Sequence, residues 1–367
     1  MIAEREIAGF VVPFTIGTTA ASMLSSPFFI SSAVPAAMSF ITASIPVFLL
    51  IHPYHQRWSR HFIIILLLIS SLGCGLLTGL THNLYSISSV HADPTASEPA
   101  IQLGELLKSG IKEIPFKNIA TNHIISALIT GDRSGISHET ISTFRDSGAS
   151  HILALSGLHL GIIYGIISWL LSFIGHSPRA NKVRAFLIIS SCGIYTMITG
   201  AGASITRAFF FILIREASRL GNRYTSTAQV LMSSLFIQLL ISPGSVSDVG
   251  FQLSYAALAG IAFIFPWFKN LWPEGKGGLM KWIWTSASMS ISCQITTGPV
   301  AYLYFGTFPQ YFLLTNLIAM PLTGLIIPSS LLTLFLNSLG ICPEYMLWFT
   351  EKLVDAMTSA MEIVASM

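Results

Sequence analysis

The sequence predicts an all-α fold, a polytopic helical membrane protein with about 10–11 transmembrane or interfacial helices and a short outer-face segment. Hydrophobic residues make up 52% of the 367 residues and charged residues 10%, and the mean hydropathy is +0.69. Soluble domains carry about 25% charged residues, so this composition excludes a soluble globular protein. Apolar stretches of roughly 18 residues or more recur along the chain, and each can cross a bilayer.

Three apolar stretches begin the chain, near residues 7–26, 28–51 and 62–82. Each is long enough to cross the hydrocarbon layer as a helix. We therefore expect residues 1–82 to form a group of N-terminal transmembrane helices.

A polar stretch follows and interrupts the hydrophobic pattern. Residues 83–120 are too few for a sizeable independent domain, so they predict a short extracytoplasmic segment. Residues 119–147 resemble two amphipathic helices separated by the sequence Gly-Asp-Arg-Ser-Gly at 131–135. They are too polar to cross the membrane, and we expect them at its surface.

The second hydrophobic block predicts one transmembrane domain over residues 121–340. Prolines 321 and 328 interrupt the stretch 311–340, which is either one kinked span or two half-helices. Residues 341–367 mix aromatic and charged side chains and predict a C-terminal amphipathic helix at the membrane surface. Further spans are expected near residues 151–174, 184–200, 204–221, 224–242, 248–268 and 281–304.

Lysine and arginine residues indicate the orientation, because cytoplasmic loops are enriched in them. If the N-terminus is cytoplasmic, 12 of the 19 basic residues face the cytoplasm. These are Arg5, Arg57, Arg60, Arg179, Lys182, Arg184, Arg215, Arg219, Arg223, Lys269, Lys276 and Lys281. The opposite orientation would violate the rule in consecutive loops, so we expect a cytoplasmic N-terminus and residues 83–150 outside.

The most distinctive window, residues 148–161, places His151, Ser156 and His159 in an apolar helix. Polar groups in a membrane are costly without partners, so these three side chains predict a pore lining or an interhelical hydrogen-bond site. Nucleophilic catalysis is a second interpretation, but His159 must fold back on its own helix to serve Ser156 as a base. Metal binding by the two histidines lacks a suitably spaced third ligand. We expect no catalytic residue, no metal and no cofactor.

Glycines recur every fourth residue in the same helix, at Gly157, Gly161 and Gly165. Such a stripe of small residues is typical of close packing between membrane helices. The stripe therefore predicts that this helix lies inside the bundle.

Further polar residues are expected at the outer ends of other spans. They are Arg207, Asp248, Gln252, Ser254 and Asn316. With a cytoplasmic N-terminus these residues share one membrane depth with His151, which predicts a polar vestibule in the outer half of the bundle. A structural ion pair between Arg207 and Asp248 is the simpler alternative, and both can hold together.

No phosphate-binding loop of the form GxxxxGK[ST] is present, so ATP hydrolysis by this sequence cannot drive transport. The metal-hydrolase pattern HxHxDH does not occur either.

Several motifs in a fixed order resemble the ComEC competence family, inner-membrane channels for DNA uptake in natural transformation. The resemblance covers roughly residues 120–330. The motifs are Gly148-Ala-Ser-His-Ile-Leu-Ala-Leu-Ser-Gly-Leu-His-Leu-Gly161, Arg207 with residues 220–223, residues 248–256, Gly298-Pro299 with Phe305-Gly306, and Asn316 with Pro321.

The resemblance implies that single-stranded DNA enters from the outer face, delivered by an extracytoplasmic receptor and pulled by a cytoplasmic ATPase or DNA-binding proteins. Arg207, His151, His159 and Gln252 are candidates to meet phosphates. Aromatic residues such as Phe209, Phe251 and Tyr255 can stack on bases, although packing is their commoner role.

Long members of the family also carry an outer OB-like domain and a metallo-β-lactamase-like domain. The first has no room in residues 83–118, and the metal motif of the second is missing. Any nuclease is therefore expected on another chain. Two other functions stay open, a permease for another polyanionic or lipid-linked substrate and an intramembrane enzyme using Ser156 and His159.

Overall fold

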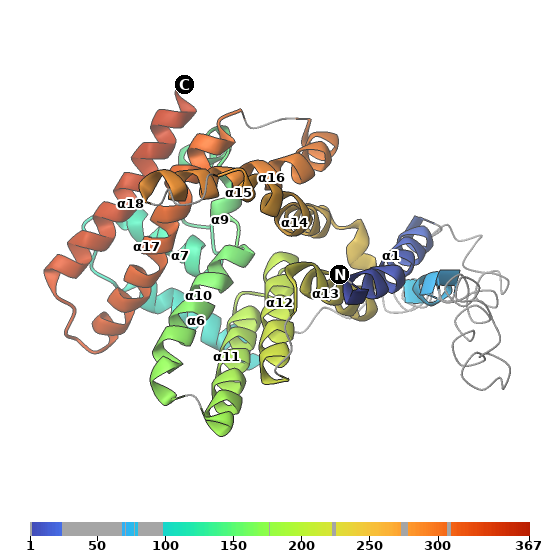
Figure 1. Ribbon diagram of the computed structural model, residues 1–367. Coiled ribbons are helices and arrows are strands. Elements are labelled where there is room, and N and C mark those ends of the chain that lie inside the picture. The colour runs from blue at the N-terminus through green and yellow to red at the C-terminus, as the bar shows by residue number, and fades with distance from the viewer. Residues whose placement is uncertain are drawn as a thin grey trace, which may run out of the picture. The chain divides into compact units, whose positions relative to one another are not determined.

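A computed structural model describes residues 2–23, 68–69, 71–76, 78–79, 98–175, 177–221, 225–272, 278–306 and 310–367. Within these residues the regular structure is helical and contains no strand (Figure 1), which confirms the expected fold class. The span expected near 28–51 lies outside the described residues, and the one near 62–82 is described only in part.

The helices form where the apolar stretches predict them, with short irregular joints between them. In chain order they are α1 (Ile2–Met23), α6 (Glu98–Lys112), α7 (Ile119–Thr130), α8 (His138–Asp146), α9 (Ser150–Leu153), α10 (Gly157–Leu170), η2 (Leu171–Ile174), α11 (Pro178–Ile198), α12 (Ala203–Leu220), α13 (Thr227–Ile241), η3 (Pro243–Ser247), α14 (Val249–Ala259), the π-helical turn η4 (Gly260–Ile264), α15 (Phe265–Asn270), α16 (Leu279–Phe305), α17 (Phe312–Ser338) and α18 (Glu344–Ala365).

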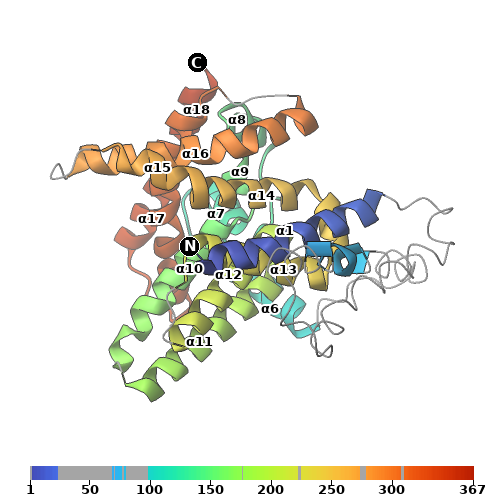
Figure 2. The same ribbon diagram turned by 45° about the vertical axis from the view of Figure 1, so that its right-hand side comes forward.

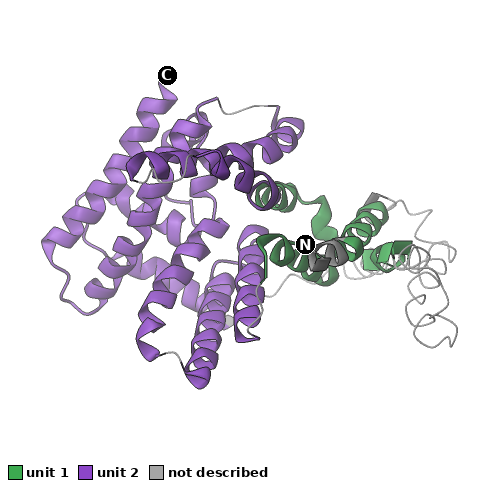
Figure 3. Ribbon diagram, viewed as in Figure 1, with its two compact units in different colours: residues 1–94, 223–258 green, residues 95–222, 259–367 purple. Residues whose placement is uncertain are grey.

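The chain divides into two compact units, coloured separately in Figure 3. Unit 1 comprises residues 1–94 and 223–258, and unit 2 comprises residues 95–222 and 259–367. In unit 1, α1 packs against α13 and η3. The rings of Phe14 and Phe236 meet edge to face there, with centroids 4.8 Å apart.

A first hydrophobic core in unit 2 joins α7, α8, α9, α17 and α18. Leu128, Phe144, Ile326 and Met357 are each completely buried in it. Helices α17 and α18 lie side by side in both Figure 1 and Figure 2. Helix α18 buries Met357 and Met361 against this core and leaves Trp348 exposed, so it is amphipathic as expected. Its place at a membrane surface stays a prediction.

A second core in unit 2 joins α10, α11 and α12. Leu160, Ile188, Cys192 and Ile205 are at most 1% exposed there. The three helices pack against one another pairwise. This core holds α10, whose first residues belong to the distinctive window of the sequence.

Three helical segments are long and apolar enough to cross a membrane: Gly157–Ile174, Val249–Asn270 and Phe312–Ser338. The chain is therefore a membrane protein. Helices α11, α12 and α16 also form where spans were expected, but they are not among these three. Charged residues in α11 and α12 and hydroxyl groups in α16 lower their hydropathy.

Three sequence expectations need correction or a decision. The expected span 151–174 is interrupted at residues 154–156, because α9 ends at Leu153 and α10 begins at Gly157. Helix α7 is buried almost all round rather than amphipathic, because α6, α9, α17 and α18 all pack against it. Residues 312–338 form one continuous helix despite two prolines, which decides for a single span.

The domain boundaries expected at residues 82, 120 and 340 were placed where the chain is expected to change from membrane spans to surface segments, not where packing between helices changes. They stay predictions.

Candidate functional site

The joint between α9 and α10 is the centre of the candidate site. Ser156 caps α10 with an extended backbone (φ −126°, ψ 169°), and its hydroxyl oxygen accepts the N–H of Leu158 at 3.2 Å. The Nδ1 atom of His159 accepts the backbone N–H of Ser156 at 3.1 Å and lies 2.9 Å from its hydroxyl. These reciprocal bonds form a capping box, with histidine in the place that glutamate or glutamine commonly takes.

The capping box fixes the hydrogen-bonding state of His159. A backbone N–H can only donate, so Nδ1 accepts, the Ser156 hydroxyl donates to it, and a neutral ring carries its proton on Nε2. His159 is 1% exposed, and its Nε2 atom finds no hydrogen-bond partner within the described residues. His159 folds back toward Ser156, as a contact between the two requires, because Ser156 stands at the start of the helix and not inside it.

His151 lies one short helix earlier and is exposed. Its Nδ1 atom is 3.1 Å from the carbonyl oxygen of Gly148, which only accepts, so Nδ1 is the protonated nitrogen. The side chain of Asn316 interacts with the His151 ring, and His151 lies close enough to His159 to act on its charge. His151 is thus linked to Asn316 and to His159, and His159 in turn to Ser156. A shared role of these four residues in a pore lining stays a prediction.

Helix α17 is fixed at this region by its first turn. The hydroxyl of Thr315 donates to the carbonyl oxygen of Ser147, in the loop before α9. The neighbouring Asn316 Oδ1 is buried and has no hydrogen-bond partner within the described part of the chain. A buried acceptor on Asn316 and a buried donor on His159 are thus both without a hydrogen-bond partner among the described residues.

The loop before α8 supports the joint from the other side. The Nε of Arg133 donates to the carbonyl oxygen of Leu153, the last residue of α9, at 3.0 Å. Gly131 has φ +80°, and a side chain there would collide with Leu155 in the joint itself. The sequence assigned no role to Arg133, although the Gly-Asp-Arg-Ser-Gly break was the signal of a structured loop.

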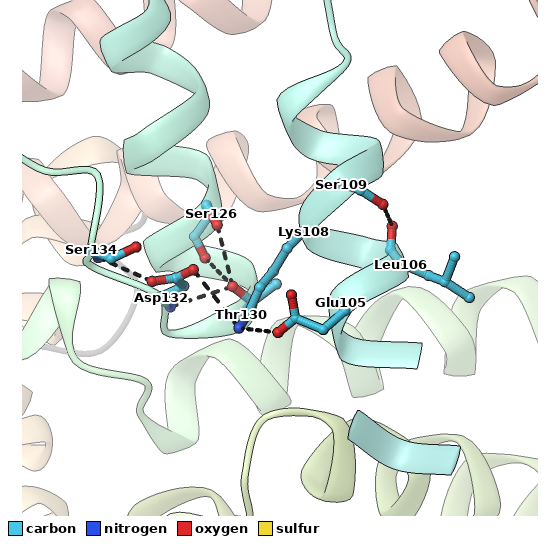
Figure 4. A network of polar contacts seen from close by, with 8 residues as sticks. All are labelled: Glu105, Leu106, Lys108, Ser109, Ser126, Thr130, Asp132 and Ser134. Carbon is cyan, nitrogen blue, oxygen red and sulfur yellow. Dashed lines mark hydrogen bonds and ion pairs between the residues drawn. The ribbon is translucent and has the colours of Figure 1, made fainter. Parts of the chain in front are cut away.

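Figure 4 shows the polar network that holds this loop against α6. Lys108 Nζ lies 2.8 Å from Glu105 Oε1 and 3.8 Å from Asp132 Oδ2. Hydrogen bonds from Ser134 lower the pKa of Asp132, and the Lys108 charge adds to this effect. The hydrogen bond to Glu105 is the main cause that raises the pKa of Lys108. The network therefore favours the charged forms of both groups.

Arg207 is 1% exposed and is the largest fully buried side chain of the described residues. Arg207 lies on a buried side of its own helix, α12, so it does not face an open water-filled vestibule in this structure. Asp248 belongs to unit 1 and caps α14, where its carboxylate accepts the N–H groups of Gly250 and Phe251. Arg207 belongs to unit 2, so the Arg207–Asp248 pair stays a prediction.

The remaining candidates of α14 have local roles. Gln252 donates from Nε2 to the carbonyl oxygen of Val246 at 3.0 Å, and Ser254 is half-buried. Phe251 and Tyr255 are buried with ring centroids 4.6 Å apart, which indicates packing. Their place on a DNA path stays a prediction.

Of the three glycines in the α10 stripe, Gly157 makes a close contact with another helix. A Cβ atom at Gly157 would lie 3.3 Å from Cβ of Ala208 in α12. At Gly161 and Gly165 an added Cβ would meet no atom of the described residues within 4 Å. Packing roles for these two glycines stay predictions.

Glu216 is a buried carboxylate that sequence analysis missed. It is 3% exposed in α12, accepts the hydroxyl of Tyr164 at 2.7 Å and pairs with Arg219 at 3.0 Å. The signal was a single acid between Arg215 and Arg219 in an otherwise apolar helix. The hydrogen bond between Tyr164 and Glu216 thus joins α10 to α12, farther along α10 than the capping box at its start.

Within the described residues, no three His, Cys, Asp or Glu side chains lie close enough together to hold a metal ion.

Comparison with known proteins identifies the family. The family model "Competence protein" matches residues 128–367. This range includes the α9–α10 joint with His151, Ser156 and His159, and also Asn316. The chain belongs to the competence protein family.

Curated relatives of this competence-family chain are distant and much longer. ComE operon protein 3 of Bacillus subtilis is 26% identical over 261 residues, covering 70% of this chain and 32% of the relative. The uncharacterized protein YcaI of Escherichia coli is 24% identical over 62% of this chain and 31% of its own length. Competence protein ComA of Neisseria gonorrhoeae is 23% identical over 54% of this chain and 28% of its own length. The chain thus matches about a third of each relative, and no solved structure matches it.

Proposed function

We propose that this chain is the membrane-embedded part of a DNA-uptake system, a channel that carries single-stranded DNA into the cytoplasm during natural transformation. The observation that carries the proposal is the competence family match over residues 128–367, which contains the polar joint. One relative is named competence protein ComA and another ComE operon protein 3. The helical spans supply the membrane setting that a channel needs.

In this proposal the α9–α10 joint lies on the DNA path. The exposed ring of His151 offers a donor or acceptor, and a strand of phosphates requires cations or donors along its way. Ser156, His159 and Asn316 shape the wall beside it. Arg207, Asp248, Gln252 and Ser254 are the further candidates for the path.

We assign no catalytic role to Ser156 and His159. The bond from the Ser156 backbone N–H to Nδ1 of His159 is the second half of a capping box. The Ser156 hydroxyl donates to the same Nδ1 atom and orients the serine side chain at the helix start.

The orientation and the partners follow from the same proposal. The N-terminus lies in the cytoplasm of a bacterium, the channel crosses the inner membrane, and residues 83–150 face outward. An extracytoplasmic receptor supplies DNA, and a cytoplasmic ATPase or DNA-binding proteins draw it in.

Deleting the gene tests the proposal. We expect transformation to be lost while labelled DNA still binds at the outer surface of the cell, because a channel acts after the receptor. Complementation with the intact gene restores transformation. Normal transformation in the deletion strain would refute the proposal, and loss of uptake of another polyanion or a lipid-linked substrate would favour a permease.

A further inference from the structure

Positive charge is concentrated at one end of the hairpin that α11 and α12 form in unit 2. A short turn joins these helices and they pack against each other, so they run antiparallel (Figure 1). The start of α11 therefore lies beside the end of α12. Residues 178–184 and 215–220 contain a single acid, Glu216. Their basic residues, here called the basic end, are Arg179, Lys182, Arg184, Arg215 and Arg219.

Most of this positive charge is not neutralised by the protein. Glu216 pairs with Arg219 at 3.0 Å, and no other ion pair engages the basic end among the described residues. Arg184 is half-buried, and its buried Nε atom has no hydrogen-bond partner in the part of the chain that the structure describes. A buried donor without an acceptor is costly, so this guanidinium is available to an acceptor from outside the chain.

Exposed aromatic rings lie beside the basic end. The segment Gly157–Ile174 is long and apolar enough to cross a membrane, and most of its residues are not buried by the protein. Its last turns expose Trp169 by 65% and Phe173 by 78%, with ring centroids 6.1 Å apart. Helix α11 packs against η2, which contains Phe173. Aromatic rings at the end of a span are typical of the level of the lipid headgroups.

We propose that the basic end binds the headgroups of anionic phospholipids at the membrane surface, with Arg184 and Arg215 as phosphate contacts. Basic side chains at this level attract anionic lipids, and an arginine fork can donate two hydrogen bonds to one phosphate. In the orientation proposed above, these lipids belong to the cytoplasmic leaflet. The site is separate from the α9–α10 joint and does not depend on DNA transport.

Aliphatic side chains favour a lipid over a DNA strand as the occupant. Leu170 and Val183 are 54% and 50% exposed beside the aromatic rings. Acyl chains cover aliphatic and aromatic side chains alike, whereas nucleobases stack on planar groups. The near absence of acids also favours an anionic headgroup, because a zwitterionic lipid brings a cation that finds no carboxylate free of its own arginine here.

Thermal unfolding of the purified full-length protein in detergent tests the lipid preference. The probes are phosphatidylglycerol and phosphatidylcholine with identical acyl chains. We expect phosphatidylglycerol to raise the unfolding midpoint more than phosphatidylcholine, because a ligand that binds the folded state stabilises it. Equal effects of the two lipids would overturn the proposal. An equal rise with glycerol 3-phosphate alone would assign the site to free phosphate instead of lipid and would overturn it too.

Variants locate the effect at the basic end. We expect Arg184→Gln and Arg215→Gln each to raise the phosphatidylglycerol concentration for half-maximal stabilisation roughly 5-fold, equivalent to about 1 kcal/mol for each basic residue near the surface. The matched control is Arg145→Gln, because Arg145 is an exposed arginine on α8, outside the basic end. Arg215 is exposed, so its variant decides the test even if Arg184→Gln does not fold. An unchanged requirement in Arg215→Gln refutes the proposed contact.

A competition experiment distinguishes lipid from DNA at the same residues. We expect labelled oligothymidylate to bind the wild type and the Arg215→Gln variant equally, because the basic end lies outside the proposed DNA path. Weaker DNA binding by Arg215→Gln, with an unchanged response to phosphatidylglycerol, would assign the basic end to DNA and overturn the lipid site. Neither result bears on transformation in the deletion strain, so this inference can fail while the channel proposal stands.

Discussion

At the scale of single residues, Ser156 has the most closely defined environment of the site. Its hydroxyl and its backbone N–H both engage His159, and its oxygen also caps Leu158. Such a pair is compatible with a helix cap and with a nucleophile beside a base. The two roles make different demands on the side chain, because a cap needs an acceptor and a nucleophile needs the hydroxyl itself.

Replacing Ser156 separates the two roles. We expect Ser156→Ala to lower stability by about 1 kcal/mol, because Leu158 loses its capping acceptor, and to reduce uptake in part. Ser156→Asn supplies another good capping oxygen and should restore most of both. Thermal unfolding of the detergent-solubilised protein and transformation frequency are the measurements. Complete loss of uptake in both variants, at normal stability, would instead indicate a catalytic serine.

Arg207 poses a similar choice between scaffold and DNA contact. A buried guanidinium that reaches phosphate in the working channel contributes a charged hydrogen bond of about 1.5–3 kcal/mol, so we expect Arg207→Ala to lower uptake roughly 10- to 100-fold. Arg207→Lys keeps the charge without the bidentate geometry and should retain part of the uptake. Immunoblots of membrane fractions measure protein level in parallel.

The Arg207→Ala, Asp248→Ala double variant is the control for this experiment. If the two residues are only a structural pair, removing both leaves no buried charge unpaired and restores level and uptake together. Rescue of uptake by the double variant would leave Arg207 as scaffold. Continued loss of uptake at a restored level supports the DNA contact.

At the scale of elements, the loop between α7 and α8 determines where α9 ends. Arg133 binds the final carbonyl of α9, and Asp132 links the same loop to Lys108 on α6. The loop therefore connects α6 with the joint that carries His151.

The Asp132 carboxylate gives this connection a pH dependence. Its pKa is lowered in the folded protein, so its contribution to stability is present above the ordinary value of 3.8 and is lost as pH falls further through the folded pKa. We expect Asp132→Asn to cost up to about 1 kcal/mol at neutral pH and to match the wild type in strong acid. Thermal unfolding from pH 7 down to about pH 1, below both the unfolded and the folded pKa, measures this difference.

Glu113→Gln is the comparison for that series, because Glu113 is exposed near the same segment. It should track the wild type at every pH. A destabilisation by Asp132→Asn that stays constant down to strong acid would contradict the charge-based explanation.

At the scale of the whole molecule, the arrangement of basic residues predicts the topology. Ser109 lies on α6 and Lys182 on α11, and both are exposed. In a cysteine-free background, a membrane-impermeant maleimide added outside should label Ser109→Cys and not Lys182→Cys. Labelling after cell lysis provides the control for accessibility. The reverse pattern would overturn the orientation and the outer position of the joint.

The sequence by itself determined the class, the family and the neighbourhood of the site. Composition alone requires a bundle of membrane helices, because a chain with 10% charged residues cannot cover a soluble surface. His151, His159 and Asn316 were expected together because motif order and membrane side place them at one depth. That reasoning uses only hydropathy and charge, which are local properties of the chain.

Only the tertiary structure decided how the polar residues are used. The break at residues 154–156, the capping role of Ser156 and the burial of Arg207 depend on neighbours from other helices, which local patterns do not contain. The same is true of Glu216, whose partner Tyr164 lies 52 positions away in the chain. Hydropathy determines which segments become helices, but side-chain packing between helices determines which polar atoms are satisfied and which remain available to a ligand.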